Sequence, residues 1–256
     1  MYQLPQMYFR GLAVDQLPDD ADYSGGILET MRCHNKGLPL WSFHRARLER
    51  SGVLDEACLG EIEQSTLKLT AGCRWPEAIA RLRVGSVRGQ QCWDLVLRPL
   101  IETAEGQVGT SLFPCSTSLP IGSNSNQGCK TLLRNRYNAA KAELPVGQFL
   151  DGLMLDSAGR VIETLRCNIL ARFGGKWMTP SLHRCGVHGV MRQWLSSHIH
   201  WQEEDMELSE LCEADELALC NSVRGVLPVV EVIGYKNWPV GVETRKLQKL
   251  ILDKLW

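Results

Sequence analysis

Two charged side chains, Lys130 and Glu163, occupy positions that a catalytic or cofactor-binding role would explain. Lys130 follows a Gly-Cys pair and precedes Arg134 and Arg136 in an expected helix. Neighbouring cations and burial favour the neutral, nucleophilic form of a lysine amine. Glu163 lies inside an expected strand, V-I-E-T-L, where a charge is unfavourable unless something pairs with it. On these grounds alone, Lys130 could still be a surface lysine and Glu163 an outward-facing glutamate.

A candidate anion-binding segment lies further along the chain. Residues 186–190, G-V-H-G-V, precede an expected helix. Backbone N–H groups at a helix start that follows glycines are a favourable cradle for a phosphate group. The alternative is a plain glycine turn into a helix, because that pattern is common in proteins that bind no phosphate.

Composition limits the classes of protein to consider. The chain has 256 residues, of which 44% are hydrophobic and 22% charged, and its formal net charge is -1. These values give no electrostatic reason to expect nucleic acid or an anionic membrane as a partner. The N-terminal residues lack basic and apolar signal regions, and no uncharged apolar run reaches the roughly 18 residues that span a bilayer. We therefore expect a soluble, cytoplasmic protein with no membrane partner.

The ten cysteines are scattered and include no C-x-x-C pair. Their spacing disfavours a disulfide framework and a zinc site, so we expect no metal and mostly buried free thiols. Cys129 directly precedes Lys130, but nothing in the sequence around it indicates a catalytic role.

The order of expected elements predicts an α+β chain of two subdomains, residues 1–118 and 129–256, joined by a linker at 119–128. Residues 114–128 are rich in Ser, Pro, Gly and Asn and have no periodic apolar pattern. The first half has expected strands at 7–14, 27–33, 80–84, 93–100 and 108–113, and helices at 43–56, with Ser42 as N-cap, and at 61–72.

The second half is expected to begin with a helix over 130–144 and to end with an amphipathic helix. The strands expected after the first helix are at 152–156, 161–173, 176–180, 216–220 and 226–233, with a helix from about Gly189. The inward-facing residues expected in the last helix are Val242, Leu247, Leu250, Ile251 and Leu255.

Short segments spread over nearly the whole chain form an ordered set. They are G-G-I-L-E-T-M-R (25–32), H-R-A-R-L (44–48), K-T-L-L-R (130–134), L-D-S-A-G-R-V-I-E (155–163) with N-I-L (168–170), T-P (179–180), G-V-H-G-V-M-R-Q (186–193) and A-D-E-L-A-L-C-N-S-V (214–223). In this order they resemble the class IV aminotransferases, the fold type IV pyridoxal-phosphate enzymes. The last two segments look like the 4-amino-4-deoxychorismate lyases of that family more than its branched-chain transaminases.

The resemblance implies a fold of two α/β subdomains with pyridoxal 5'-phosphate between them. It implies that Lys130 carries the cofactor and is the catalytic base, and that Glu163 pairs with the protonated pyridine nitrogen. Lys141 should be an ordinary residue of a helix surface. The other cofactor-binding residues implied are Arg47, which follows His44 by three residues, and Val187, Gly189, Val190, Ser222 and Asn168. Candidates for the substrate carboxylates are Arg32, Arg134 and Arg166.

Several positions depart from the family pattern. Leu133 replaces an asparagine that usually follows the lysine by three residues, and no Asp-Arg pair stands in register ahead of Gly25-Gly26. Leu165 and Arg166 stand where the family has small residues, so they would crowd or recharge the face of the cofactor. These departures concern the substrate more than the cofactor.

The activity implied is that of a lyase, which releases pyruvate from 4-amino-4-deoxychorismate to give 4-aminobenzoate for folate synthesis. The alternatives are a class IV aminotransferase acting on a branched-chain or D-amino acid, and a diverged paralogue that binds without turnover. The partners expected are a small-molecule substrate and a second copy of the chain in a homodimer, and no nucleic acid.

Overall fold

The computed structural model describes residues 4–122 and 128–256. They form two compact units, one containing the described residues up to Glu102 together with Cys129–Leu133, the other containing the remainder. This division differs from the subdomain boundaries expected from the sequence.

Strand pairing explains the difference. Residues 110–114 hydrogen-bond to strands of the second unit, whereas 129–133 pair with a strand of the first. Of the expected linker at 119–128, residues 123–127 lie outside the part of the chain that the structure describes.

An antiparallel sheet in the order β2-β1-β5-β4-β3 forms the first unit. Most of its inward-facing side chains are apolar, with the buried Glu29 of β3 as an exception, and β3 is an edge strand. The strands are β1 (Gln6–Phe9), β2 (Leu12–Ala13), β3 (Ser24–His34), β4 (Glu77–Val87) and β5 (Gln90–Pro99), and a short 3-10 helix, η1 (Asp20–Asp22), precedes β3. The strand expected at 7–14 is a hairpin instead, because Arg10 and Gly11 both adopt positive φ angles, 48° and 82°.

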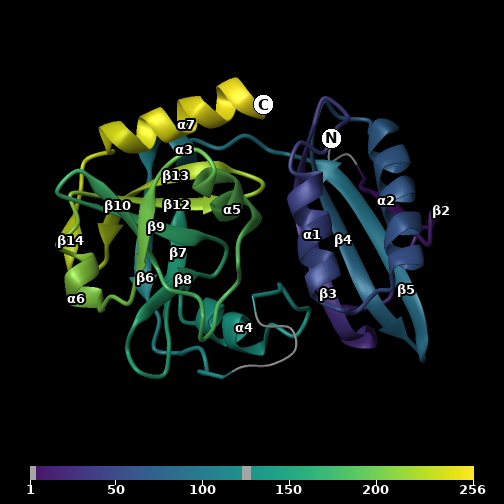
Figure 1. The fold of residues 1–256 in the computed structure, drawn as a ribbon, viewed down its shortest axis with the longest axis horizontal. Coiled ribbons are helices and arrows are strands. Elements are labelled where there is room, and N and C mark those ends of the chain that lie inside the picture. The colour runs from purple at the N-terminus through teal and green to yellow at the C-terminus, as the bar shows by residue number, and fades with distance from the viewer. Residues whose placement is uncertain (1–3, 123–127) are drawn as a thin grey trace. The chain divides into compact units, whose positions relative to one another are not determined.

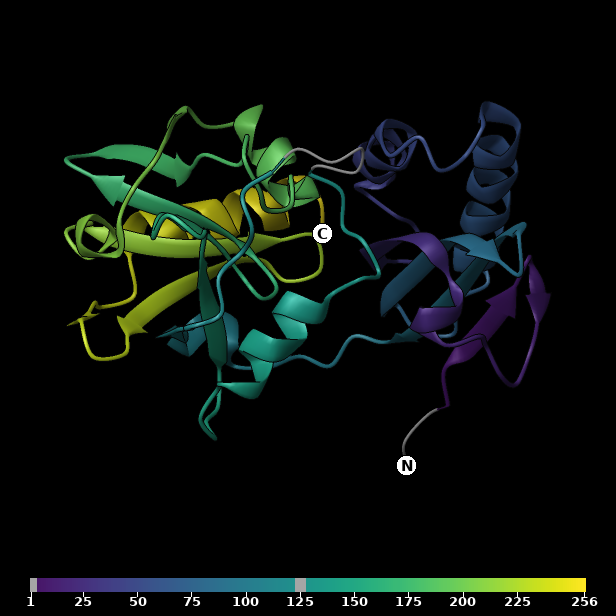
Figure 2. The same ribbon diagram turned by 90° about the horizontal axis from the view of Figure 1, so that it is seen from below.

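Two helices, α1 (Trp41–Arg50) and α2 (Glu56–Ala71), cover one face of this sheet (Figures 1 and 2). The expected first helix ends early because Gly52 has a φ of 64°. Its N-cap residue is Leu40 rather than Ser42. The second begins earlier than expected because the Asp55 carboxylate accepts a hydrogen bond of 2.8 Å from the Cys58 N–H.

The second unit is built on a mixed nine-stranded sheet. Eight strands follow the order β11-β10-β9-β12-β13-β6-β7-β8, and β14 pairs with β13. The strands are β6 (Thr110–Pro114), β7 (Leu150–Leu155), β8 (Val161–Thr164), β9 (Asn168–Phe173), β10 (Lys176–Pro180), β11 (Trp201–Glu204), β12 (Glu216–Asn221), β13 (Gly225–Val232) and β14 (Lys236–Asn237).

The longest helix of this unit, α7 (Val242–Lys254), packs on β12 and β13 (Figure 1). Its buried stripe contains Thr244, Leu247 and Ile251. Val242, expected to face inward, is 68% exposed because 100° per residue turns it away from that stripe. The shorter helices are α3 (Glu105–Val108), α4 (Asn135–Ala142), α5 (Val190–Ser196) and α6 (Leu208–Leu211).

Two expected elements near the candidate site differ from the structure. The helix expected over 130–144 covers only Asn135–Ala142, and Thr131 ahead of it pairs with Ile27 of β3. The long strand expected over 161–173 is two strands, β8 and β9, joined by a tight turn. In that turn Thr164 N–H donates to the Cys167 carbonyl at 2.8 Å, and Cys167 N–H donates to the Thr164 hydroxyl at 2.9 Å. The turn places Glu163 next to the end of β8.

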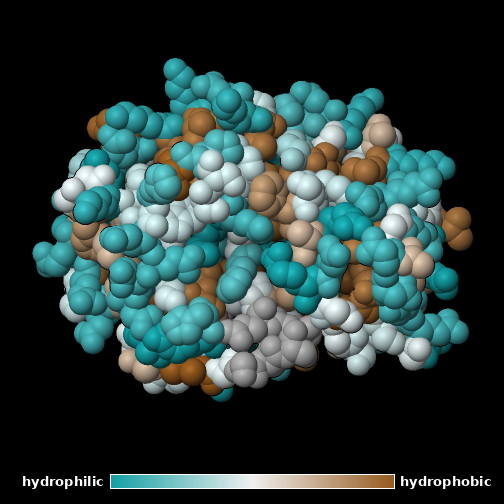
Figure 3. Space-filling model, in the orientation of Figure 1, coloured by the Kyte–Doolittle hydropathy of each residue, from teal (hydrophilic) through white to brown (hydrophobic). Residues whose placement is uncertain are grey.

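One face of the molecule is mainly polar (Figure 3), and the cysteines are mainly buried. The face shown in Figure 3 is mostly hydrophilic, with hydrophobic residues in small groups. Among the described residues, no helix combines the length and apolar character that crossing a bilayer requires. All ten cysteines are free, and all but Cys58 are buried.

Candidate active site

A short extended segment that pairs with the edge of the first sheet carries Lys130. The N–H of Leu28 in β3 donates to the Lys130 carbonyl at 2.7 Å, and the Leu132 N–H donates to the Gly26 carbonyl at 2.8 Å. The Lys130 side chain is half-buried, and its Nζ donates to Thr30 Oγ1 at 3.3 Å. Strand pairing, rather than a helix start, therefore positions this amine.

One buried carboxylate of the first unit binds two side chains of α1. Glu29 is 0% exposed and accepts two hydrogen bonds from Arg47, Nε to Oε1 at 2.8 Å and Nη2 to Oε2 at 2.5 Å. His44 Nδ1 contacts Oε2 at 2.5 Å. Burial by itself would raise the pKa of Glu29, but Arg47 and His44 outweigh burial and lower that pKa to about 2. The forked contact holds the Arg47 guanidinium in one orientation.

His44 is a neutral member of this cluster. Burial is the main cause that lowers the pKa of His44. The Glu29 carboxylate acts in the opposite direction, and the charges of Arg47 and Lys130 add to the lowering. A neutral ring bound to Glu29 carries its proton on Nδ1, which leaves Nε2 as an acceptor. That Nε2 is buried and has no hydrogen-bond partner among the residues that the structure describes.

Glu163 is the corresponding carboxylate of the second unit. It lies in β8, is 3% exposed, and accepts a hydrogen bond from the Tyr137 hydroxyl on Oε1. Its Oε2 accepts from the Val187 N–H at 3.1 Å and from Asn168 Nδ2 at 3.3 Å. Donors from α4, β9 and the loop before α5 thus fix one carboxylate that faces a network rather than solvent. The structure brings together three residues expected to bind the cofactor, namely Glu163, Asn168 and Val187.

Close packing at glycines shapes the loop before α5. A Cβ at Gly189 would lie 1.9 Å from Asn168 Oδ1, and a Cβ at Gly186, where φ is 94°, would lie 2.7 Å from Ile162 Cγ2. The N–H of Val187 serves Glu163, and the N–H of His188 donates to the Gly128 carbonyl at 2.9 Å. The backbone donors for an anion in this loop are therefore those that begin the helix, where no intrahelical acceptor exists.

The other residues expected to bind a phosphate group lie at the ends of elements, as expected from the sequence. Gly189 is the N-cap of α5, and Val190 is its first residue and is buried. Ser222 is half-buried and follows directly after β12. Lys141, by contrast, is an exposed residue of α4.

The three arginines expected to bind substrate carboxylates all contact protein groups. Arg32 Nε donates to Glu77 at 2.7 Å. The Arg134 guanidinium lies 3.8 Å from the ring centroid of Tyr137, and its Nη2 donates to the Leu165 carbonyl at 3.0 Å.

Arg166 contacts two carboxylates. Its Nη2 contacts Glu105 at 3.1 Å, and its Nε contacts the buried Asp151 at 3.3 Å. These two carboxylates balance the charge of this arginine.

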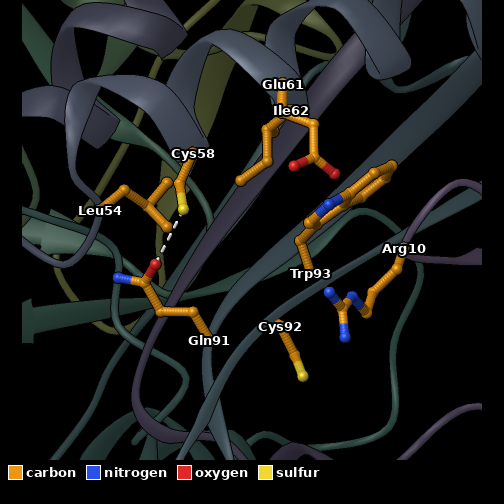
Figure 4. A pocket seen from close by; sticks show the side chains of 8 residues that line it. All are labelled: Arg10, Leu54, Cys58, Glu61, Ile62, Gln91, Cys92 and Trp93. Carbon is orange, nitrogen blue, oxygen red and sulfur yellow. Dashed lines mark hydrogen bonds between the residues drawn. The ribbon is translucent and has the colours of Figure 1, made fainter.

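A small cavity in the first unit contains none of the expected site residues (Figure 4). Its volume is about 50 Å³. Clefts that hold drug-sized ligands and cofactors measure roughly 300–1,000 Å³, so this cavity is suited to a few water molecules. Its lining residues are Arg10, Leu54, Cys58, Glu61, Ile62, Gln91, Cys92 and Trp93.

Sequence reasoning missed Glu29 and Tyr137 as members of these networks. Glu29 carries the same signal as Glu163, a charge inside an apolar strand, G-I-L-E-T-M, and could have been found by it. Tyr137 carries no comparable signal, because a tyrosine in the first turns of a helix is common on any surface.

Comparison with known proteins identifies the family. The model of the amino-transferase class IV family matches residues 26–232. An aminodeoxychorismate lyase of Vibrio harveyi is 34% identical over 153 residues, which are 55% of this chain and 54% of that protein. A probable branched-chain-amino-acid aminotransferase of Aquifex aeolicus is 30% identical over 122 residues, 44% of this chain and 39% of that protein. These matches span about half or less of the two relatives.

A solved structure matches over nearly the full length of both chains. The 4-amino-4-deoxychorismate lyase of Pseudomonas aeruginosa has a TM-score of 0.81 and 30% identity, covering 97% of this chain and 99% of that chain. The chain belongs to the amino-transferase class IV family, and the resemblance and the α+β fold inferred from the sequence are confirmed.

Proposed function

We propose that this chain is a pyridoxal-phosphate-dependent 4-amino-4-deoxychorismate lyase, which releases pyruvate from its substrate and leaves 4-aminobenzoate. The observation that carries the cofactor assignment is the Glu163 carboxylate, which is only 3% exposed and is bound by donors from three separate segments. A carboxylate so fixed is the partner that a protonated pyridine nitrogen needs.

The other residues fit the same cofactor. Gly189 keeps the start of α5 free of a side chain that would collide with Asn168, so backbone donors can approach a phosphate group. Arg47 supplies a cation whose orientation Glu29 fixes. Lys130 supplies the amine that holds the cofactor.

When bound, pyridoxal phosphate supplies a cationic ring that stabilises negative charge on the amine-bearing carbon of a bound amine. Once the substrate amine has taken its place on the cofactor, the released Lys130 amine would take the proton from that carbon. The bond between the substrate ring and the enolpyruvyl oxygen then breaks, the same amine would return a proton to the departing enol, which leaves as pyruvate, and the ring that remains becomes aromatic. Glu163 keeps the pyridine nitrogen protonated throughout, and Thr30 holds the Lys130 amine through its hydroxyl oxygen.

The lyase is favoured over an aminotransferase by the likeness to the Pseudomonas aeruginosa lyase, which extends over nearly the whole of both chains at 30% identity. The early steps of both reactions use the same residues, so the presence of Lys130 and Glu163 does not distinguish a lyase from a transaminase. A transaminase would need a keto acid to complete its second half-reaction, whereas the lyase needs none.

The test is incubation of the purified protein and pyridoxal phosphate with 4-amino-4-deoxychorismate. We expect 4-aminobenzoate, followed by its fluorescence, and pyruvate in equal amounts, without a keto acid. Lys130→Ala should abolish turnover, and Glu163→Gln should slow it by about two to four decades, as for a key acid–base or electrostatic group. Lys141→Ala, an exposed lysine of α4, is the matched control and should retain activity. Amino transfer to a keto acid without 4-aminobenzoate would assign the chain to the transaminases instead.

A further inference from the structure

Tyr137 joins two structural roles in the second unit. It lies in α4, and its ring packs against an apolar cluster that includes Ala140, Met154 and Ile162. The Arg134 guanidinium lies 3.8 Å from the ring centroid. At the other end of the side chain, the hydroxyl donates to Glu163 Oε1. The ring is therefore anchored independently of the hydroxyl.

The hydroxyl contacts a different carboxylate oxygen from the other donors. The Val187 N–H and Asn168 Nδ2 both bind Glu163 Oε2. Donors on both oxygens restrain the carboxylate against tilting about either one, and they leave the remaining lone pairs in a defined direction.

The hydroxyl keeps its proton in this environment. Burial first, and then the negative charge of Glu163, raise the pKa of Tyr137 well above its usual value. A neutral phenol has one proton to donate, and Glu163 receives it. Arg134, with its side chain over the ring and its Nη2 on the Leu165 carbonyl at 3.0 Å, holds the tyrosine in this orientation.

We propose that Tyr137 is a positioning residue for the cofactor: its hydroxyl holds Oε1 of the Glu163 carboxylate, while Val187 and Asn168 hold Oε2, and thereby strengthens the bond from that carboxylate to the protonated ring nitrogen. The proposal rests on the role given to Glu163 in the proposed function. It does not depend on whether the chain is a lyase or a transaminase, because both need the ring nitrogen protonated.

The test compares two ligands on the cofactor-free protein. One is pyridoxal 5'-phosphate, and the other is its 1-deaza analogue, in which a C–H replaces the ring nitrogen. Tyr137→Phe should raise the dissociation constant of pyridoxal phosphate about tenfold, the size of losing one hydrogen bond to a charged group. The affinity for the deaza analogue should stay unchanged, because Glu163 has no ring N–H to bind there. The dissociation constants come from absorption and fluorescence titrations, without any turnover.

A matched control exists in the first unit. The Tyr23 hydroxyl donates to the buried carboxylate of Asp94, so Tyr23→Phe removes the same kind of bond from a carboxylate that has no part in the site. Tyr23→Phe should leave both dissociation constants at the wild-type values. In a Glu163→Gln background, Tyr137→Phe should have no further effect on pyridoxal phosphate, because its action passes through the carboxylate.

Equal losses for the two ligands would overturn the proposal, because Tyr137 would then act through packing alone. Unchanged binding of pyridoxal phosphate by Tyr137→Phe would overturn it too. Should the phenylalanine variant not fold, Tyr137→Gln, which keeps a donor, must bind pyridoxal phosphate better than Tyr137→Leu, which has none. A wild-type protein that binds no pyridoxal phosphate would instead contradict the proposed function, and the two failures are thus distinguishable.

Discussion

At the scale of single residues, Glu29 supplies the buried negative charge beside Arg47 in the first unit. Its carboxylate is completely buried and is shared by Arg47 and His44. A buried ion pair adds little net stability over an apolar pair, but removal of one partner leaves the other charge buried and uncompensated. Loss of Glu29 would therefore leave the charge of Arg47 buried and uncompensated, and Arg47 is the residue that we propose binds the cofactor phosphate.

Glu29→Gln should lower the free energy of unfolding by about 3 kcal/mol at neutral pH, the scale of a broken buried pair. The pKa of Glu29 is about 2 in the folded chain against an ordinary 4.5, so the stability it contributes is present above 4.5 and is lost as the pH falls towards 2. The variant should lack this part of the acid dependence. Urea unfolding measured across that pH range checks both expectations.

Glu49→Gln is the control for that experiment. Glu49 is 57% exposed and pairs with Arg45 one helical turn away at 3.4 Å. Exposed pairs of this kind contribute roughly 0.3–0.5 kcal/mol, so this variant should unfold almost as the wild type does. A Glu29→Gln protein as stable as the control would show that Arg47 needs no buried counter-charge.

At the scale of elements, the candidate site residues of each unit lie where strands and helices end. Lys130 lies on a segment that extends the edge of β3, Glu163 lies near the end of β8, and the glycine loop leads into α5. At such ends the backbone can leave its regular pattern and the side chains are held by close packing. The approach of the α5 N-cap to Asn168 is the tightest of these contacts.

Gly189→Ala tests that contact without imposing backbone strain, since the φ of Gly189 is -65°. The new Cβ would lie 1.9 Å from Asn168 Oδ1, so Asn168 must move and its bonds to Glu163 and the Val187 carbonyl must weaken. We expect a lower melting temperature and weaker binding of pyridoxal phosphate, by about tenfold for a lost hydrogen bond to a charged group. Thermal unfolding and ligand titration measure the two effects.

The same substitution at Gly60 is the control. Gly60 lies in α2, and a Cβ there would meet no described atom within 4 Å. Alanine in a helix interior is favoured over glycine by roughly 0.8–1.0 kcal/mol, so Gly60→Ala should raise the melting temperature. If Gly189→Ala were stabilising in the same way, the packing between α5 and β9 would not be the constraint we describe.

At the scale of the whole molecule, we expect the chain to assemble as a homodimer, as the family resemblance implies. Several large apolar side chains are exposed, including Leu12, Val146 and Leu252. Light scattering on the purified protein at micromolar concentration should give about twice the 28.7 kDa of one chain. A mass of a single chain over the whole concentration range would contradict the expectation.

The sequence by itself determined the family, the α+β class and most of the elements. Short motifs such as H-R-A-R-L and G-V-H-G-V-M-R-Q keep their residues in order, and local patterns of alternation and glycine turns define most strands and the start of α5. Such signals are local, because they depend on backbone preferences and on side chains close together in the chain.

Only the tertiary structure decided which residues share a network. The helix expected from Lys130 gave way to an extended segment because the edge of β3 offered hydrogen bonds a hundred residues away in the chain. The bond from Tyr137 to Glu163, and the sharing of Glu29 by Arg47 and His44, likewise join separate elements. Burial makes those bonds strong and is a property of the packed chain, so no local pattern predicts them.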